Sequence, residues 1–591
     1  MNTKTKNKGN GYLASMKCLA KSIREYKKPS ILAPVFVAME VVIECLIPYV
    51  MTLLLDKINT ASTDTLMTEV LKHGALLIVL ALLSLSCGAL SGRFCAVASS
   101  GFAKNLRHDL FYKIQGFSFS NIDKFSSSSL VTRLTTDVSN VEMSYMMIIR
   151  TAVRSPFMLI FSMVMAFTLN ARIALIFLAT TPVLAIGLIL IMTKAIPFFN
   201  KIFKRYDKLN ESVEENIRGM RVVKSYVRED YEKEKFDSAS SKVRNDFTKA
   251  EKIIALNGPL MNFCAYSGLI AIYVFGSLLI IKSKGELMKW TELQSFMTYS
   301  FQMLMSLMML SMIMVTLIMS SVCAKRIAEV LNEKNAIVSP ENAVTEVKDG
   351  SLEFKNVSFK YSSSADKYAL KGINLKIESG ETVGVLGSTG SSKSTLVNLI
   401  PRLYDVTEGE MLVSNVNVKE YDLNVLRDSV AMVLQKNVLF SGTLRENMQW
   451  GDKDATDEEI LSALRLAQID NFPLDKRIEQ GGVNVSGGQK QRLCIARALL
   501  KKPKILILDD STSAVDTKTD ALIRKSFKEY IPETTKIIIA QRVSSVQDAD
   551  KIIIMDNGEL TAIGTHDELL NDNAIYQELY YSQNKAGDNN G

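Results

Sequence analysis

Long apolar runs alternate with polar stretches over the first 320 or so residues, and the pattern changes after about residue 350. Six mainly apolar runs lie at about 31–55, 74–96, 146–169, 173–192, 253–281 and 295–321. A helix of roughly 20 residues, at ~1.5 Å per residue, crosses a hydrocarbon core of ~30 Å. The pattern therefore predicts an all-α membrane domain of six long helices, followed by a soluble α/β domain.

Two long polar stretches, at about 97–145 and 193–252, separate spans two and three and spans four and five. They favour helix and contain few prolines, so we expect the helices to continue from the membrane into the cytoplasm. Both stretches and the N-terminal segment are rich in Lys and Arg, which predicts that they and both termini are cytoplasmic. The amphipathic segment 12–28 is expected along the inner membrane surface.

Composition and charge narrow the class of protein. The 591 residues are 47% hydrophobic, which is high for a soluble enzyme, and the formal net charge is +8. The basic residues lie between apolar runs rather than in one stripe, so the sequence does not support nucleic-acid binding. The seven cysteines show no metal or disulfide spacing, and we interpret them as small buried apolar side chains.

A glycine-rich segment near the middle of the chain predicts a phosphate-binding loop. It follows an apolar, β-branched run at 381–386 and consists of Gly387, Ser388, Thr389, Gly390, Ser391, Ser392, Lys393, Ser394 and Thr395. In such a loop, backbone N–H groups and the start of the next helix face the phosphates of ATP. We expect Lys393 to reach the β- and γ-phosphates and the Ser394 hydroxyl to bind Mg²⁺.

Two segments further along the chain complete an ATPase pattern. A Val-Ser-Gly-Gly-Gln turn at 485–489 precedes an apolar strand at 505–508, which ends in Asp509 and Asp510. We expect Asp509 to hold the same Mg²⁺, directly or through water. A lone glycine-rich loop is often only a turn, but these segments in this order indicate an ATPase.

The six spans and the single C-terminal cassette resemble a half-transporter of the ATP-binding-cassette (ABC) exporter family over nearly the whole chain. Segments 125–137 and 215–226 are similar to the first and second cytoplasmic loops of that family. The resemblance implies that short helices at the tips of these loops transmit force from the ATPase domains to the spans. It also implies that the second loop docks on the ATPase domain of a partner.

The resemblance also assigns roles to single residues. Gln435 is similar to the family's glutamine that contacts Mg²⁺ and senses the spans, and Tyr361 lies where the family stacks an aromatic ring on adenine. Ser486, Gly487, Gly488 and Gln489 match the signature motif, which grips an ATP held by the partner's loop.

The expected organisation follows from these motifs. A cytoplasmic N-terminus with the amphipathic helix covers 1–30, and the transmembrane domain with its two long cytoplasmic loops covers 31–321. A linker at 322–350, a nucleotide-binding domain at 351–582 and a polar tail at 583–591 complete it. ATP and Mg²⁺ are the expected cofactors.

Two departures from the family pattern fall on the catalytic positions. Asp510 stands where the family has a Glu that orients the attacking water. Asp is one methylene shorter than Glu, so its carboxylate is set back by about 1.5 Å. Such a shift of a catalytic group can lower the rate on the order of 10²-fold. Gln541 stands where the family has a histidine that touches the γ-phosphate. Loss of a general base costs about 10² to 10⁴ in rate. We therefore expect slow hydrolysis, or none, at this chain's own loop.

A third departure lies inside the loop, where Ser392 replaces the glycine that the motif has before Lys393. If the backbone has a positive φ here, Ser is strained by about 1 kcal/mol or more. If it does not, the exchange is tolerated, and nucleotide binding is expected in either case.

An intact signature beside a weakened catalytic position predicts a heterodimer with a second half-transporter that carries the competent site. The alternative is a homodimer with two slow sites. We expect a multi-pass exporter, of multidrug type or for small amphipathic substrates, in the plasma membrane of a bacterium. The same fold also serves importers of metal chelates, and degenerate sites also occur in ATP-gated channels or regulators. We expect no peptidase domain before the spans, which disfavours a peptide-processing exporter.

Candidates for the substrate pathway lie in the first and sixth spans. Glu40 and Glu44 are four residues apart and share one helix face, where they would attract a cationic substrate or form a structural pair between helices. Span six is rich in methionine, including Met303 and Met312, whose side chains adapt to varied apolar shapes. These methionines are distributed around the helix rather than along one face, so lipid contact and packing are an alternative explanation of their number.

Overall fold

The computed structural model describes residues 15–588 except 61–62, 363–364, 471 and 512–513. It divides into two compact units. The first consists of Met1–Gln115 and Ser127–Glu333, and the second of Gly116–Ser126 and Lys334–Gly591. The beginning of the predicted amphipathic helix and the end of the predicted polar tail lie outside the described residues.

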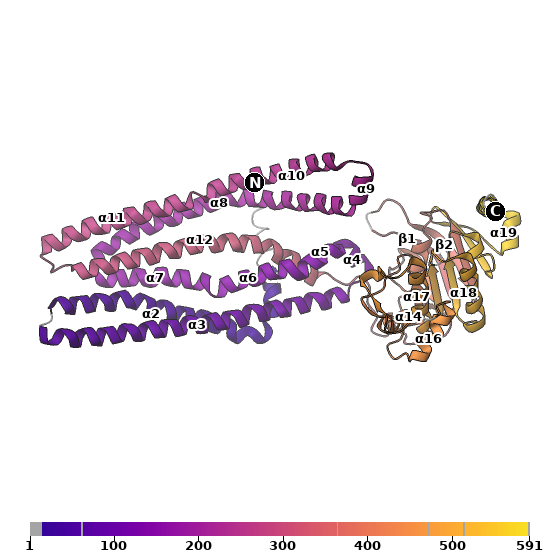
Figure 1. Ribbon diagram of the computed structural model, residues 1–591, viewed down its shortest axis with the longest axis horizontal. Coiled ribbons are helices and arrows are strands. Elements are labelled where there is room, and N and C mark those ends of the chain that lie inside the picture. Colours follow the sequence, from indigo (N-terminus) through magenta and orange to yellow (C-terminus); the bar gives the residue numbers. More distant parts are fainter. Residues whose placement is uncertain (1–14, 61–62, 363–364, 471, 512–513, 589–591) are drawn as a thin grey trace. The chain divides into compact units, whose positions relative to one another are not determined.

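The first unit is built from helices that run side by side (Figure 1). The long ones are α2 (Lys27–Thr60), α3 (Thr63–Gln115), α6 (Val138–Ile149), α7 (Thr151–Leu169), α8 (Ala171–Arg218), α10 (Glu229–Ile254), α11 (Asn257–Ser283) and α12 (Trp290–Asn332). The short ones are η1 (Lys21–Tyr26), α5 (Ser127–Thr132), η2 (Arg133–Asp137) and α9 (Met220–Ser225). Six stretches of the described chain are helical, long and apolar enough to cross a membrane, which confirms the predicted fold class.

The surface of this unit has the apolar character that lipid contact requires. Leu85, Ile189 and Phe263 have 69%, 61% and 69% of their surface exposed. A soluble monomer rarely exposes large apolar patches of this kind. Small residues such as Ala33 and Ala98 are fully buried between the helices, where they allow close packing.

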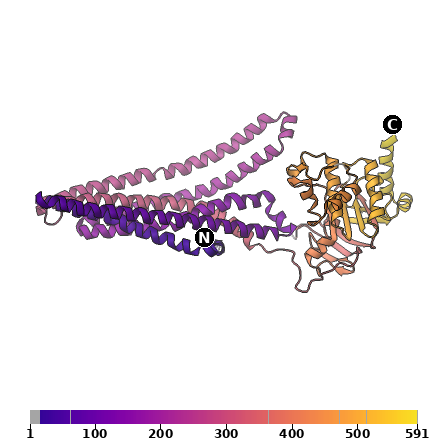
Figure 2. The same cartoon turned by 60° about the horizontal axis from the view of Figure 1, so that its bottom comes forward.

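The helices continue beyond the apolar runs, as the polar stretches predicted. Helix α3 extends to Gln115 and α8 to Arg218, and α9 connects α8 to α10. Figure 2 shows α8 and α10 separating from the other helices toward α9. Helix α12 extends to Asn332, so the first residues of the segment expected as a linker at 322–350 are helical.

The second unit contains two main sheets. A six-stranded sheet has the order β12-β11-β3-β10-β9-β6, in which only the pairing of β11 with β12 is antiparallel. Its strands are β3 (Thr382–Gly387), β6 (Val430–Val433), β9 (Ile505–Asp509), β10 (Thr535–Ile539), β11 (Lys551–Asp556) and β12 (Glu559–Gly564). A four-stranded antiparallel sheet, β2-β1-β4-β5, is formed by β1 (Leu352–Phe359), β2 (Leu370–Ile377), β4 (Glu408–Val413) and β5 (Val416–Asn417), and β7 (Gly442–Thr443) pairs with β8 (Arg477–Ile478).

Helices surround these sheets. They are α13 (Lys393–Asn398), α14 (Leu423–Ser429), α15 (Leu444–Met448), α16 (Asp457–Leu466), α17 (Gly487–Leu500), α18 (Thr517–Tyr530), α19 (His566–Asp572) and α20 (Ala574–Asp588), with the short turns η3 (Gln480–Gly482) and η4 (Val543–Ser545). The short helix α4 (Phe119–Phe125) also belongs to this unit.

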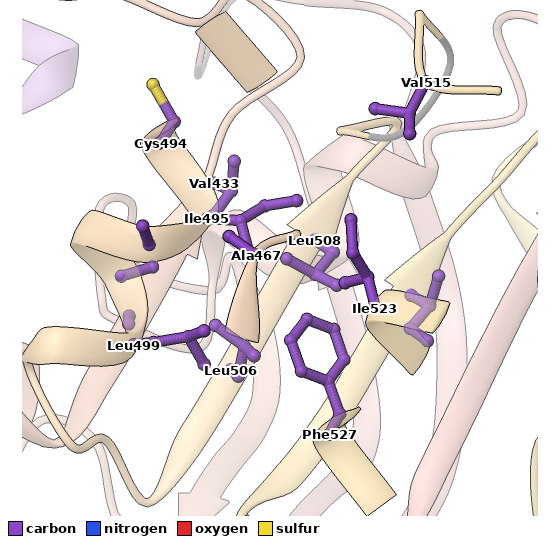
Figure 3. Close-up of a cluster of buried hydrophobic side chains, with 14 of the residues drawn as sticks. Val433, Ala467, Cys494, Ile495, Leu499, Leu506, Leu508, Val515, Ile523 and Phe527 are labelled. Carbon is purple, nitrogen blue, oxygen red and sulfur yellow. The ribbon is translucent and has the colours of Figure 1, made fainter. Parts of the chain in front are cut away.

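The core of the second unit holds the strand that carries the predicted acids. Leu506 and Leu508 of β9 are buried in one cluster with Ile495 of α17 and with Ile523 and Phe527 of α18 (Figure 3). All five residues of β9 are buried. Apolar packing on the strand therefore determines where Asp509 and Asp510 lie.

Candidate functional site

The predicted phosphate loop connects β3 to α13, which begins at Lys393. Gly387, the last residue of β3, has φ 151°, and a Cβ there would lie 2.2 Å from the Met555 carbonyl oxygen, so only glycine fits. The Lys393 ammonium donates to the carbonyl oxygens of Gly387 and Ser388 at 2.8 Å each. The Lys393 ammonium thus lies against the loop backbone, where the motif requires a positive charge to bind phosphates.

The backbone at Ser392 settles the alternative that the sequence left open. Ser392 has φ 70° and ψ 25°, which is the left-handed region. For a residue other than glycine, this conformation costs about 1–2 kcal/mol. The loop therefore contains a strained residue immediately before Lys393.

We expect Ser392→Gly to tighten ATP binding about five-fold, which corresponds to about 1 kcal/mol. Glycine adopts the left-handed conformation without strain, so this form of the loop is stabilised relative to forms in which residue 392 has a negative φ. The measurement is the Kd of a fluorescent ATP analogue on the purified full chain. Ser388→Gly is the matched control, because Ser388 is not among the residues with positive φ. An unchanged or weaker affinity of Ser392→Gly would contradict the strain argument.

A hydroxyl and a carboxylate meet where Mg²⁺ is expected. Ser394 Oγ donates to Asp509 Oδ1 at 3.0 Å. Burial raises the pKa of Asp509 above its usual value, against the effect of the Ser394 hydrogen bond. Hard oxygen donors of this kind suit Mg²⁺, and a bound cation would offset the cost of the buried carboxylate. When bound, the ion would neutralise charge on the β- and γ-phosphates.

The two catalytic positions that depart from the family pattern, Asp510 and Gln541, contact each other. Gln541 Nε2 donates to Asp510 Oδ2 at 2.9 Å, and Gln435 Nε2 lies 3.5 Å from the same oxygen. Burial raises the pKa of Asp510, and both amides act in the opposite direction. The carboxylate that would orient water is therefore held by side-chain amides.

These residues surround one cavity of about 290 Å³. Its lining consists of Thr389, Gly390, Ser392, Lys393, Ser394, Thr395, Gln435, Asp509, Asp510, Ile539 and Gln541. The structure thus brings together the predicted loop, magnesium and catalytic positions, which come from four separate segments of the chain.

Tyr361 lies beside the loop and is part of an aromatic cluster. Its hydroxyl is 2.9 Å from Thr395 Oγ1, and its ring meets the Tyr404 ring edge-on at 5.3 Å. Tyr404 in turn contacts α4, because its hydroxyl donates to Asp123 Oδ2 at 2.8 Å and its ring lies 6.1 Å from that of Phe119.

Sequence reasoning missed Tyr404 and the helix that it contacts. The helix α4 (Phe119–Phe125) ends where the segment quoted as similar to the first cytoplasmic loop begins, and that segment itself forms α5 and η2. The second quoted segment contains α9. The available signal was the sequence Ser118–Asn121, which forms a capping box typical of a helix start.

The signature residues form the start of a helix away from this cavity. Ser486 is the N-cap of α17, its Oγ accepts from the Gln489 N–H at 3.3 Å, and Gln489 Oε1 accepts from the Ser486 N–H at 3.2 Å. Ser486 and Gly487 are exposed. Neither these residues nor Gly488 and Gln489 line the cavity, so within the described chain they lie apart from the phosphate loop.

The substrate-pathway candidates have different surroundings. Arg154 of α7 donates to Glu40 Oε1 at 2.5 Å and to Glu44 Oε2 at 2.7 Å, an ion pair between helices that the sequence did not reveal. Met303 is buried with Phe296 and Phe177. Met312 instead lines an apolar cavity of about 390 Å³.

Comparisons with known proteins match both parts of the chain to transporter families. Residues 30–307 match the family described as ABC transporter transmembrane region, and residues 370–513 match ABC transporter. The chain is 33% identical over 578 residues to an uncharacterized ABC transporter ATP-binding protein of Mycobacterium tuberculosis (strain ATCC 25618 / H37Rv), covering 96% of this chain and 97% of the relative. It is also 33% identical to YfiB of Bacillus subtilis (strain 168), another such protein, covering 95% and 97%.

One further relative is named for its substrate, and one solved structure has a similar fold. A fatty acid ABC transporter ATP-binding/permease protein of Mycobacterium bovis is 31% identical over 485 residues, covering 80% of this chain and 75% of the relative. The structure of a bacterial Atm1-family ABC exporter with ATP bound superposes with a TM-score of 0.81 at 21% identity, covering 95% of this chain and 98% of that one.

Fold and site together define a transmembrane domain fused to a P-loop ATPase domain. The chain belongs to the ABC transporter family, as a half-transporter with the exporter fold.

Proposed function

We propose that this chain is one subunit of a heterodimeric, ATP-driven exporter, whose own phosphate loop hydrolyses ATP slowly and whose signature completes the partner's competent site. The observation that carries this proposal is the Asp510 carboxylate held by the Gln541 amide at 2.9 Å. An amide cannot accept a proton as an imidazole does, and a shortened carboxylate engaged by amides is a poor base for water. Binding of ATP and Mg²⁺ is retained in the proposal, because Lys393, Ser394 and Asp509 all line the cavity at the loop.

The need for a second subunit is supported by two features. The cavity at the loop lacks the signature residues, so an ATP held there has donors on one side only. In addition, no residue of α9 is buried, and Val222 and Tyr226 at this tip are 60% and 74% exposed. An exposed apolar tip of this kind is suited to docking on the ATPase domain of a partner.

The substrate class is proposed as small and amphipathic. The cavity of about 390 Å³ beside Met312 is lined mainly by apolar side chains, including Met261, Met308 and Met319, which adapt to varied shapes. The similarity to a fatty acid transporter is consistent with a cargo that has an apolar body. We propose a bacterial plasma membrane with both termini cytoplasmic, because Lys- and Arg-rich segments that flank membrane spans stay on the cytoplasmic side.

The test is to purify the chain alone and together with the product of its neighbouring gene, and to measure ATP turnover of both. We expect the lone chain to be at least about 10²-fold slower than the pair, given the loss of the base. If the lone chain hydrolysed ATP cooperatively and as fast as the pair, a homodimer would explain the data and the asymmetric proposal would be wrong. Uptake of a labelled substrate into inside-out vesicles, driven by ATP, tests the direction.

A further inference from the structure

Strand β10 contains a buried lysine, Lys536, that does not line the ATP cavity. Lys536 is 4% exposed and lies among buried apolar residues of a strand with neighbours on both sides, β3 and β9. Placing an ammonium group at such a position costs free energy unless it has partners. The sequence shows the same anomaly, a lysine before Ile537, Ile538 and Ile539.

The side of β10 that carries Lys536 faces a cavity of about 330 Å³ beneath α18. Four cationic side chains line it, namely Arg524, Lys525, Lys528 and Lys536, and Asp548 is the acidic residue of the lining. Phe527 and Ile538 contribute an apolar wall; Phe527 is visible beside Ile523 in Figure 3. The volume lies within the range of small-ligand sites.

The donors of these cations are only partly used by the described residues. Lys536 Nζ donates to the Ile531 carbonyl oxygen at 3.1 Å, which accounts for one of its three donors. Arg524 Nη1 donates to Asp548 Oδ2 at 2.8 Å, whereas the buried Arg524 Nε has no hydrogen-bond partner. Nε lies 3.4 Å from Asp520 Oδ2, an oxygen that already accepts from Ser545 Oγ at 3.1 Å.

Several acidic groups lie near these cations: Asp520 is buried against Arg524, and Glu529 lies 3.8 Å from the Lys525 ammonium. The Asp548 side chain is 72% exposed, so it can turn into solvent and release Arg524. Asp550 accepts from the Thr382 N–H at 2.8 Å and is engaged there. Burial lowers the pKa of Lys536, and the Lys528 ammonium acts in the same direction while Asp550 opposes it. Basic residues at the end of α18 also complement its helix dipole, but this does not explain a buried lysine on a neighbouring strand.

We propose that this cavity is a binding site for a small phosphate-bearing anion, held by Lys536, Arg524 and Lys528. A guanidinium group and two ammonium groups around one hollow suit phosphate oxygens, since each charged hydrogen bond is about twice as strong as a neutral one. The volume exceeds that of a single phosphate, and the wall of Phe527 and Ile538 accommodates the carbon body of a phosphate monoester. The site is separate from the ATP cavity, which the neighbouring Ile539 lines.

The test uses the full chain in detergent with the Lys393→Ala substitution, so that the ATP loop does not bind the probe. Inorganic phosphate and glycerol 3-phosphate are titrated by calorimetry. We expect saturable binding of both, a loss of at least about ten-fold in affinity on adding Lys536→Met, and a smaller loss on adding Lys528→Ala. Lys518→Ala is the matched control on α18, because Lys518 is exposed and does not line the cavity.

The outcomes separate the proposal from a structural role of Lys536. Absence of saturable binding, or equal affinity with and without Lys536→Met, would overturn it. If Lys536→Met does not fold, Lys528→Ala decides alone, since Lys528 is exposed and its removal leaves the core intact. Binding of inorganic phosphate without glycerol 3-phosphate would overturn the assignment to a phosphate monoester. This inference does not depend on the heterodimer, so its failure leaves the proposed function unaffected.

Discussion

Replacing Asp510 by Glu and Gln541 by His together is expected to raise ATP turnover at this chain's own loop by about 10²-fold or more. In the structure the Asp510 carboxylate is held by the Gln541 amide at 2.9 Å. The double substitution lengthens the acid arm toward the γ-phosphate and removes the amide that holds it. Asp510→Glu alone is expected to gain less, because Gln541 would still engage the carboxylate. Phosphate release by the purified chain, with and without its partner, measures the effect.

The control for this prediction is a matched pair of substitutions at exposed positions of the same domain. Asp454→Glu with Gln480→His changes the same residue types, and neither position lines the ATP cavity. Turnover of the control is expected to equal that of the unchanged chain. If the pair at Asp510 and Gln541 gained no more than this control, unequal ATP sites would no longer explain the departures from the family pattern.

Gly487→Asp is expected to reduce ATP turnover of the heterodimer by about 10² to 10³, the usual cost of losing a key electrostatic donor. Gly487 is the first residue of α17, whose N–H groups would face the γ-phosphate of an ATP held by the partner. A carboxylate there repels that phosphate. The backbone tolerates a side chain, because a Cβ would meet only the Ala514 Cβ, at 3.8 Å, which is ordinary contact.

The loss of turnover in Gly487→Asp is expected to come from the added charge, and ATP binding at this chain's own loop is expected to be unaffected. Gly487→Asn, which has nearly the same size without the charge, should retain most of the turnover. The Kd of ATP at this chain's loop should remain within about two-fold in both variants, since Gly487 does not line that cavity. If Gly487→Asp left turnover unchanged, the signature of this chain would not act in the competent site.

The class of protein was evident from the sequence because its evidence is local. Each apolar run is long enough to cross a membrane by itself, and each motif consists of neighbouring residues, so neither depends on a distant partner. The order of the loop, the signature and the strand before Asp509 predicted the ATPase fold in the same way. The polar stretches between spans, which favour helix and contain few prolines, similarly predicted helices that extend beyond the membrane.

Tertiary structure decided the contacts between distant segments. Asp510 meets Gln541 because β9 and β10 are parallel neighbours with Asp509 opposite Ile539, so the residues after both strands lie at one sheet edge. Strand order is a property of the whole sheet, which no local pattern encodes. Arg154 reaches Glu40 and Glu44 for the same reason, since the packing of α7 on α2 brings together residues more than a hundred positions apart.

Ser392 shows, for a single residue, what the local sequence determines and what the tertiary structure decides. The sequence alone identified the departure from the loop motif, because the motif is a local string of residues. Whether serine is strained there depends on φ, which the surrounding sheet and helix impose by fixing where β3 ends and α13 begins. Local pattern thus determined the family and the positions of the site, whereas long-range packing determined which side chains meet and which backbone angles they must adopt.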